Sequence, residues 1–276
     1  DVSAATNAGI AVINSPTGNI IAAAEHTMGL ILASARHIPQ AASSMRSGLW
    51  QRGNFMGSEL KNKVLGIIGA GKVGSEVAKR AKSFEMNVIA YDPFISTDRA
   101  NRMGIELRSL EELLSSSDFV TLHTPFMEST ENMLSDAQFA LMKNGARLVN
   151  VARGELIDDD ALLRALESEK ISVAALDVFR GEPSIDERLS EHPNIIATPH
   201  LGGSTVEAQE AVAIEAAEQL IDILNGSFGK NIVNAPMLGP ENQSVVSPMI
   251  PVAEMIGKLA IGLSEGQFRS VSLIYE

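Results

Sequence analysis

Residues 64–74 read VLGIIGAGKVG, in which a short apolar run leads directly into a glycine-rich turn. A Gly-x-Gly-x-x-Gly pattern on its own is a weak signal, but one placed between a strand and a helix is typical of dinucleotide-binding units. In such units the first glycine, here Gly69, permits a tight turn, Gly71 lets a pyrophosphate approach the backbone, and Gly74 lets the helix pack against the strand. We therefore expect a phosphate group to bind at the N-terminus of the following helix, predicted over Ser75–Ser83.

An acidic residue ends the next predicted strand, 18 residues after Gly74. This residue, Asp92, lies close to the spacing of about 20 at which dinucleotide-binding units place the carboxylate that binds the adenosine ribose. A carboxylate there accepts hydrogen bonds from the ribose hydroxyls and repels a 2′-phosphate, so the sequence favours NAD over NADP. The alternative is that Asp92 only caps the turn at Pro93, because Asp-Pro turns are common.

Short apolar runs alternate with helical stretches along most of the chain. The first helix is expected to have Asn19 as its N-cap and to end near Arg36. The apolar runs contain no alternation of polar and apolar residues, which indicates strands that are covered on both faces. The fold class is therefore α/β, with a Rossmann-type doubly wound parallel sheet. The predicted strands are Val64–Ile68, Val88–Tyr91, Phe119–Leu122, Leu148–Val151, Val173–Leu176 and Ile195–Ala197.

A long helix is expected after the last of these strands, because apolar residues recur every fourth position up to Leu224 and Asn225-Gly226 can end it. Polar, Pro and Gly residues then precede a second helical stretch, which extends to about Ser264, and a final strand, Val271–Tyr275. One helix and one strand cannot form a stable domain. Since the first residue, Asp1, is also not Met, we expect a piece of a longer protein.

The composition argues against several classes of function. The 34 acidic residues outnumber the 22 basic ones, the net charge is −12 and no Lys/Arg run is present, so neither a nucleic acid nor a membrane surface is an expected partner. No apolar run approaches the length of about 18 residues that a membrane span needs. The chain has no Cys, which fits a reducing compartment, and we expect the cytoplasm. No metal-ligand spacing and no Gly-x-Ser-x-Gly elbow is present, so neither a metal site nor a serine hydrolase is expected.

Polar residues follow the carboxyl ends of the other predicted strands, where open parallel sheets bind ligands. They include Thr124, Arg153, Asp177 and His200. The repetition of this placement from strand to strand is a stronger signal than any one of the residues. Thr124, rather than its neighbour His123, is expected to contact the ligand.

Three residues near this edge have the chemistry for a hydride transfer. The guanidinium of Arg153 can bind a substrate carboxylate and polarise an adjacent carbonyl. His200 can accept or donate the hydroxyl proton, and Glu182 can hold the His200 ring in one tautomer. Taken singly, each of these residue types is more often structural; together, beside a dinucleotide motif, they favour catalysis. The residues interpreted as structural are His26, His37 and His192.

Eight short motifs, spread over most of the chain, carry a resemblance to a known family. They are NSPTGN (14–19), ARHIPQA (35–41), GAGKVG (69–74), YDP (91–93), HTP (123–125), NVARGE (150–155), LDVFRGEP (176–183) and PHLGGST (199–205). With them, the chain resembles the D-isomer-specific 2-hydroxyacid dehydrogenases. The intervals between Arg153, Glu182 and His200, 29 and 18 residues, are also those of the family. Within the family, the chain is most similar to the branch that oxidises 3-phospho-D-glycerate.

The resemblance implies a reaction and a set of site residues. The reaction is the oxidation of 3-phospho-D-glycerate to 3-phosphooxypyruvate with NAD, the first step of L-serine biosynthesis, and the catalytic residues are Arg153, Glu182 and His200. The expected cofactor contacts run from the pyrophosphate through the ribose to the nicotinamide and the loop that closes the site. They are Gly69, Gly71, Lys72, Val73, Gly74, Asp92, Thr124, Val151, Ala152, Arg153, Asp177, His200, Gly202 and Gly203.

The resemblance also implies a domain organisation, because in this family the cofactor domain is inserted in a substrate domain whose larger part precedes it. Residues 1–18 are expected to be a remnant of the substrate domain and residues 19–203 the NAD-binding Rossmann domain. Residues 204–226 would return to the substrate domain, and residues 227–276 would begin an additional C-terminal domain. The groups that bind the substrate phosphate would lie mostly in the larger, N-terminal part of the substrate domain, which this chain is expected to lack. We therefore expect NAD binding but weak or no turnover by this chain.

Two other functions remain open. A sister enzyme would act on another small 2-hydroxy or 2-oxo acid, such as glyoxylate or hydroxypyruvate. A non-catalytic NAD-sensing interaction protein would share the fold, but the chain lacks a basic or low-complexity tail, which disfavours this class.

The expected partners are a phosphorylated 2-hydroxy acid and a second copy of the chain. The first helix and the Trp50–Met56 segment carry more apolar surface than one domain needs to cover. A homodimer or a higher homo-oligomer through these segments is therefore expected, and the family resemblance supports it.

Overall fold

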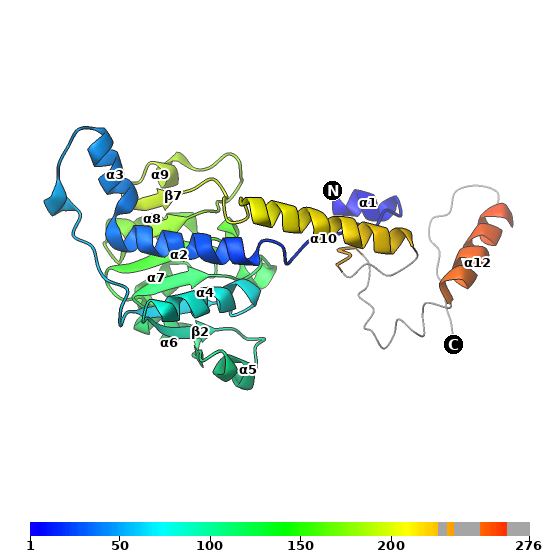
Figure 1. Ribbon diagram of the computed structural model, residues 1–276, viewed down its shortest axis with the longest axis horizontal. Helices are drawn as coiled ribbons and strands as arrows, with labels where there is room; N and C mark the ends of the chain where they lie inside the picture. Colours follow the sequence, from blue (N-terminus) through cyan, green and yellow to red (C-terminus); the bar gives the residue numbers. More distant parts are fainter. Residues whose placement is uncertain (226–230, 235–248, 264–276) are drawn as a thin grey trace. The chain divides into compact units, whose positions relative to one another are not determined.

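The computed structural model describes residues 1–225, 231–234 and 249–263 (Figure 1). The chain divides into a larger unit, Thr17–Val212, and a smaller one that combines Asp1–Pro16 with Ala213–Glu276. Gly226 and the predicted strand Val271–Tyr275 lie outside the described residues. Across the described ranges, no helix has both the length and the apolar character that crossing a membrane requires.

The larger unit contains a seven-stranded sheet in the order β3-β2-β1-β4-β5-β6-β7. All neighbouring strands are parallel, which confirms the predicted doubly wound sheet. The six predicted strands are present, with ends shifted by no more than two residues. The strands are β1 (Val64–Ile68), β2 (Asn87–Tyr91), β3 (Glu106–Leu107), β4 (Phe119–Leu122), β5 (Ala146–Asn150), β6 (Ile171–Leu176) and β7 (Ile195–Ala197).

Helices cover both faces of this sheet (Figure 1). Side chains from α2 and α4 fill the core on one face, and side chains from α6, α7 and α8 fill the core on the other. Ile67 and Ile68 of β1 enter opposite cores, which explains why the strand has no polar face. The helices named here are α2 (Ile20–Arg36), α4 (Lys72–Ser83), α6 (Leu110–Ser116), α7 (Asp136–Leu141) and α8 (Asp159–Glu167).

Two local features differ from the sequence prediction. The edge strand β3 is not predicted, because its two residues pair only with β2 and no apolar run marks them. The start of α4 is predicted wrongly: the helix begins at Lys72 rather than Ser75, since Gly71 has an extended backbone and serves as the N-cap. Gly74 therefore lies inside the first turn of the helix. Further helical elements are α1 (Val2–Asn7), α3 (Ile38–Arg46), α5 (Thr97–Arg102), α9 (Glu187–Ser190), α10 (Val206–Leu224), α12 (Ile250–Leu263) and the 3₁₀ turns η1 (Arg52–Asn54), η2 (Glu128–Thr130) and η3 (Gly154–Leu156).

The smaller unit joins the N-terminal segment to residues that follow Val212. Ile13 and Ile232 form an isolated antiparallel bridge. The Val12 amide donates to Asn234 Oδ1 at 2.8 Å, and Gln219 Nε2 donates to the Asn14 carbonyl at 2.9 Å. Segments from the two ends of the described chain thus belong to one unit, although their assignment to a substrate domain stays a prediction.

Glu85, in the turn between α4 and β2, has a left-handed backbone with φ 57°. A residue with a Cβ is disfavoured there by about 1 kcal/mol relative to glycine. Its ion pair with Lys61, at 2.9 Å, joins two largely exposed side chains and contributes little. We expect Glu85→Gly to raise the free energy of unfolding by about 0.5–1 kcal/mol in urea titrations. Glu85→Ala, which loses the ion pair but keeps the Cβ, should not raise the free energy of unfolding. Equal free energies of unfolding for the two variants would contradict this explanation.

Candidate active site

The carboxyl ends of the parallel strands bring the predicted site residues to one edge of the sheet. The chain passes from β1 outward to β2 and β3 and then returns to β4 on the other side of β1. Ligands of open α/β sheets bind at such a reversal of strand order. In sheet order, the edge carries Asp92 after β2, Gly69 after β1, Thr124 after β4, Arg153 after β5, Asp177 after β6 and His200 after β7.

The glycine turn after β1 has the shape that a dinucleotide requires. Gly69 has φ +94°, and a Cβ on it would lie 2.6 Å from the His123 carbonyl oxygen. A Cβ on Gly74 would lie 2.1 Å from the carbonyl oxygen of Gly69, so this glycine permits close packing of helix and turn. A Cβ on Gly71 would meet no atom within 4 Å. The space in front of Gly71 is therefore open to a ligand.

The N-terminus of α4 faces this space without a capping side chain. The first-turn amides of a helix, here including Lys72 and Val73, have no intrahelical acceptor. Such amides bind phosphate, with the helix dipole favouring the negative charge. The residues present thus fit the pyrophosphate of NAD.

Asp92 fixes the end of β2 to the glycine turn. Its Oδ2 accepts a hydrogen bond from the Ala70 amide at 2.8 Å, and its Oδ1 accepts from the amides of Phe94, at 2.9 Å, and Ile95. Asp92 therefore does cap its turn. Because a carboxylate has about four acceptor positions, it retains capacity for a ribose hydroxyl.

The turn after β4 contains one supporting residue and one candidate contact. The His123 ring contacts the buried Thr121 hydroxyl, with Nε2 3.0 Å from Oγ1. Desolvation lowers the pKa of His123 to about 4, so the ring is neutral at pH 7. The Thr124 hydroxyl donates a hydrogen bond to the Met133 sulfur, at 3.7 Å. His123 therefore supports the turn beneath Thr124.

The turn after β5 is held by a residue that the sequence analysis does not single out, Asn150. Its buried side chain accepts from the Ala152 amide at 3.0 Å and donates to the Arg153 carbonyl at 2.8 Å. The Arg153 side chain is exposed, and its Nη1 donates to the Ala152 carbonyl at 2.6 Å. Within the described residues, no carboxylate forms an ion pair with this guanidinium. It is therefore available to an anionic substrate.

Glu182 and His200 form a hydrogen-bonded pair, with Nδ1 2.6 Å from Oε2. Glu182 Oε1 also accepts from the Phe179 amide at 2.8 Å. Burial by itself would raise the pKa of Glu182, but the hydrogen bonds from His200 and Phe179 outweigh it and hold the pKa below its usual value. The ionised carboxylate keeps the His200 proton on Nδ1, which leaves Nε2 for a substrate.

The backbone at His200 is left-handed, with φ 54°. This conformation costs a non-glycine residue roughly 1–2 kcal/mol, so the surrounding contacts must hold it. A mostly apolar pocket of about 310 Å³ lies against the Glu182–His200 pair. It is lined by Phe179, Glu182, Pro183, Ile185, Ala197, Thr198, Pro199 and His200.

The carboxylate of Asp177 is fully buried beneath the loop that carries His200. It accepts from the Thr198 hydroxyl at 2.6 Å and from the amides of Leu201 and Gly202, both at 2.8 Å. Burial alone would raise the pKa of Asp177, but hydrogen bonds from His26, Thr198 and Leu201 hold it below its usual value. The carboxylate is thus ionised and organises the loop.

His26 and Thr198 also contact this carboxylate, and neither is a predicted site residue. His26 Nε2 lies 3.0 Å from Asp177 Oδ1, across 151 positions of sequence. No local pattern could indicate that contact. Among the described residues, no group of three or more His, Cys, Asp or Glu side chains is arranged to hold a metal ion.

Comparison with known proteins identifies the family. Residues 28–202 match the model of the D-isomer specific 2-hydroxyacid dehydrogenase, NAD binding domain. The chain is 47% identical to D-3-phosphoglycerate dehydrogenase 2, chloroplastic, of Arabidopsis thaliana, over 100% of this chain and 45% of the relative. It is 47% identical to D-3-phosphoglycerate dehydrogenase of Methanocaldococcus jannaschii, over 100% of this chain and 53% of the relative. The chain thus spans about half the length of these curated relatives.

A solved structure agrees with this match. D-lactate dehydrogenase from Aquifex aeolicus, complexed with NAD and lactic acid, superimposes with a TM-score of 0.76 at 30% identity, over 86% of this chain and 77% of that chain. The family model covers the glycine turn, Asp92, Arg153, Glu182 and His200. The chain therefore belongs to the D-isomer specific 2-hydroxyacid dehydrogenases and contains their NAD-binding domain.

Proposed function

We propose that the protein oxidises 3-phospho-D-glycerate to 3-phosphooxypyruvate with NAD, the first step of L-serine biosynthesis, and that it does so in the cytoplasm. The observation that carries the proposal is the Glu182–His200 pair, 2.6 Å apart, at the same sheet edge as a glycine turn fit for NAD. The names of the relatives from Arabidopsis thaliana and Methanocaldococcus jannaschii support this substrate.

The proposed mechanism assigns one task to each catalytic residue. Arg153 binds the substrate carboxylate and polarises the carbon–oxygen bond of the 2-hydroxyl group, which becomes the carbonyl of the product. His200 Nε2 accepts the hydroxyl proton, while Glu182 holds the proton on Nδ1 and stabilises the resulting imidazolium. NAD, when bound, supplies the acceptor for the hydride.

The substrate is tested by comparing turnover of 3-phospho-D-glycerate with that of unphosphorylated 2-hydroxy acids. We propose that the cofactor domain comprises residues 19–203, flanked by substrate-domain pieces at 1–18 and 204–226 and by a further domain from 227. Turnover by this chain alone should then be weak, so the assay uses the full-length protein that we expect to contain this chain. A preference of that protein for lactate or glyoxylate-type acids would overturn the phosphoglycerate assignment.

Asp92 should decide the choice of cofactor. We expect Asp92→Ala to weaken NAD binding by about 10–100-fold, because the proposed hydrogen bond from a ribose hydroxyl to the charged carboxylate is lost. Calorimetric titration of NAD and NADP against both proteins checks this. Asp92→Asn retains an acceptor for the turn amides but loses the charge, and should gain affinity for NADP. Equal binding of both dinucleotides by the wild type would contradict the NAD preference.

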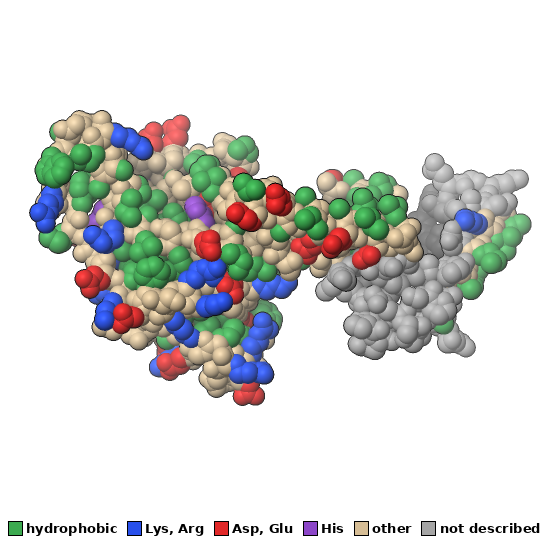
Figure 2. All heavy atoms as spheres, viewed as in Figure 1, with side chains coloured by type: hydrophobic (Ala, Val, Ile, Leu, Met, Phe, Trp, Pro, Cys, Tyr) green, Lys and Arg blue, Asp and Glu red, His purple; other side chains and the backbone are tan. Residues whose placement is uncertain are grey.

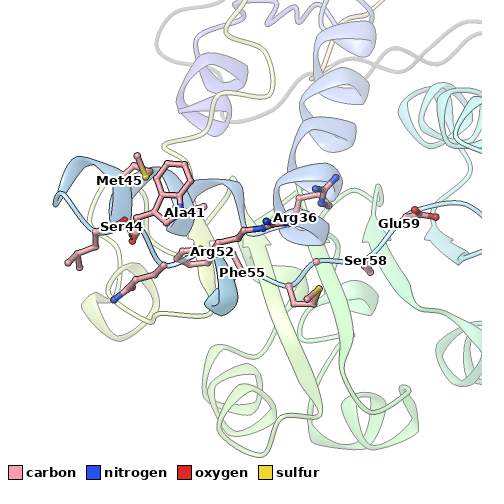
Figure 3. A pocket seen from close by; sticks show the side chains of 13 residues that line it. Arg36, Ala41, Ser44, Met45, Arg52, Phe55, Ser58 and Glu59 are labelled. Atoms are coloured by element: carbon pink, nitrogen blue, oxygen red, sulfur yellow. Dashed lines mark hydrogen bonds between the residues drawn. The ribbon is translucent and has the colours of Figure 1, made fainter.

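We also propose that the protein forms a homodimer or a higher homo-oligomer through the Trp50–Met56 segment and the adjoining α3. The first helix, α2, which the sequence analysis expects to share this interface, instead buries most of its apolar side chains in the core of the larger unit. Trp50 and Met56 are 81% and 84% exposed, and Figure 2 shows hydrophobic side chains gathered over this end of the larger unit. The segment curves around a hollow of about 590 Å³, which is lined by Arg36 at the end of α2 and by Met45 and Phe55 (Figure 3). Exposed apolar clusters of this kind mark interfaces. Sedimentation velocity should show a dimer for the wild type and a monomer for Trp50→Glu; a monomeric wild type would refute the proposal.

A further inference from the structure

The loop that carries His200 depends on contacts from outside itself. His200 has φ 54°, a region that non-glycine residues rarely adopt. Its amide donates to the carbonyls of Asp177, at 2.8 Å, and Thr198, at 3.0 Å. A strained backbone at a functional residue persists only when its surroundings fix it.

The Asp177 carboxylate supplies most of this support. Its Oδ1 accepts from Thr198 Oγ1 and the Leu201 amide, and its Oδ2 accepts from the Gly202 amide. The donors thus lie on both sides of His200 in sequence. Because the carboxylate is buried, its orientation determines where the loop can lie.

The remaining contact to this carboxylate comes from α2, which crosses one face of the sheet (Figure 1). His26 Nε2 lies 3.0 Å from Asp177 Oδ1 and 3.2 Å from Thr198 Oγ1. An ionised carboxylate only accepts, and the Thr198 hydroxyl donates its single proton to Oδ1. The proton on His26 must therefore be on Nε2, and this ring donates to Asp177 in either charge state.

A second contact ties the same face of α2 to the loop. A Cβ on Gly202 would lie 2.9 Å from Val151 Cγ1 and 3.9 Å from Ala23 Cβ. Ala23 and His26 are three residues apart and share one face of the helix. The loop thus packs on the helix where His26 reaches the carboxylate.

We propose that His26 is a positioning residue of this site: its Nε2–H fixes the Asp177 carboxylate, and through it the loop that presents His200. The inference rests on the proposed function only for the role of His200 in proton transfer. His26 does not touch the reacting groups, and its effect is transmitted through Asp177.

The test compares three variants of the 276-residue chain. His26→Leu removes the donor at similar size, and His26→Gln places an amide nitrogen near the position of Nε2. Thr27→Val is the matched control: Thr27 is the next residue on α2, and its hydroxyl donates to the Ala23 carbonyl within the helix, at 2.8 Å, rather than to Asp177. NMR-detected amide exchange of Leu201 and Gly202 without dinucleotide reports on the loop, and calorimetry reports NAD affinity.

We expect exchange at Gly202 to become about tenfold faster in His26→Leu, the effect of losing a hydrogen bond to a buried charge, and NAD affinity to fall about fivefold. His26→Gln and Thr27→Val should stay within about threefold of the wild type in both measurements. Exchange of core amides in β1 and β4 shows that each variant is folded.

The proposal is overturned if His26→Leu leaves the exchange at Gly202 unchanged. It is also overturned if His26→Gln speeds exchange at Gly202 and weakens NAD binding as much as His26→Leu does. The same holds if Thr27→Val produces these effects. A failure of the proposed function is a separate result, in which the full-length protein binds NAD and does not oxidise 3-phospho-D-glycerate. The exchange data would still decide the role of His26.

Discussion

Replacing His200 with asparagine is expected to lower kcat by roughly 10²–10⁴-fold, the usual contribution of general acid–base catalysis. Asparagine retains a donor near the position of Nδ1 and can keep the contact to Glu182, now 2.6 Å long. It lacks an equivalent of Nε2, the atom proposed to accept the hydroxyl proton. The change therefore removes the reacting nitrogen and spares the pair that orients it.

The measurement follows NADH absorbance during turnover by the full-length protein. NAD affinity, measured separately by calorimetry, should change by less than about threefold, because the proposed pyrophosphate and ribose contacts lie after β1 and β2. His200→Gln, which places nitrogen near Nε2 and loses the contact to Glu182, provides the complementary variant. Retention of more than a tenth of wild-type kcat by His200→Asn would contradict a proton-transfer role.

Gly74→Ala is expected to have the largest effect on the glycine turn. The added Cβ would lie 2.1 Å from the Gly69 carbonyl oxygen and 3.2 Å from Ile67 Cγ2. Since the nearer atom belongs to the backbone, the helix must move away from the turn. We expect a loss of about 1–3 kcal/mol in the free energy of unfolding, as for overpacked cores, and at least a tenfold loss of NAD affinity.

Gly71→Ala is the matched control for this prediction. Its Cβ would meet no atom within 4 Å, so stability should remain within about 0.5 kcal/mol of the wild type. NAD binding should nevertheless fall, because the methyl group would occupy the space offered to the pyrophosphate. Urea unfolding and calorimetry on both variants separate the two effects. If Gly71→Ala bound NAD normally, the pyrophosphate would have to lie elsewhere.

The sheet could be predicted from the sequence because each of its long strands is buried on both faces. The buried strand Phe119–Leu122 is apolar apart from Thr121, and that pattern is local. The edge strand β3 lacks the pattern, since its first residue, Glu106, is exposed. The start of α4 was misplaced because Gly71 caps the helix through its backbone alone, and a glycine gives no side-chain signal for a cap.

The sequence predicts the site residues that directly follow strands. It does not predict contacts between residues that are far apart in sequence. Arg153 and His200 stand directly after predicted strands, so the parallel topology alone places them at one edge. His26 lies on a helix whose sequence indicates only burial, and its contact with Asp177 depends on how α2 packs on the sheet. The hydrogen bonds of Asn150 likewise arise from a turn whose shape the sequence does not specify.

The order of the strands also has a consequence for redesign. Asp92 follows β2 and His200 follows β7, five strand positions apart, or about 24 Å at the usual spacing between strands. Substitutions at such a separation, with no shared neighbours, combine additively. We therefore expect coenzyme preference and proton chemistry to be modular in this domain, so that either can be re-engineered without retuning the other.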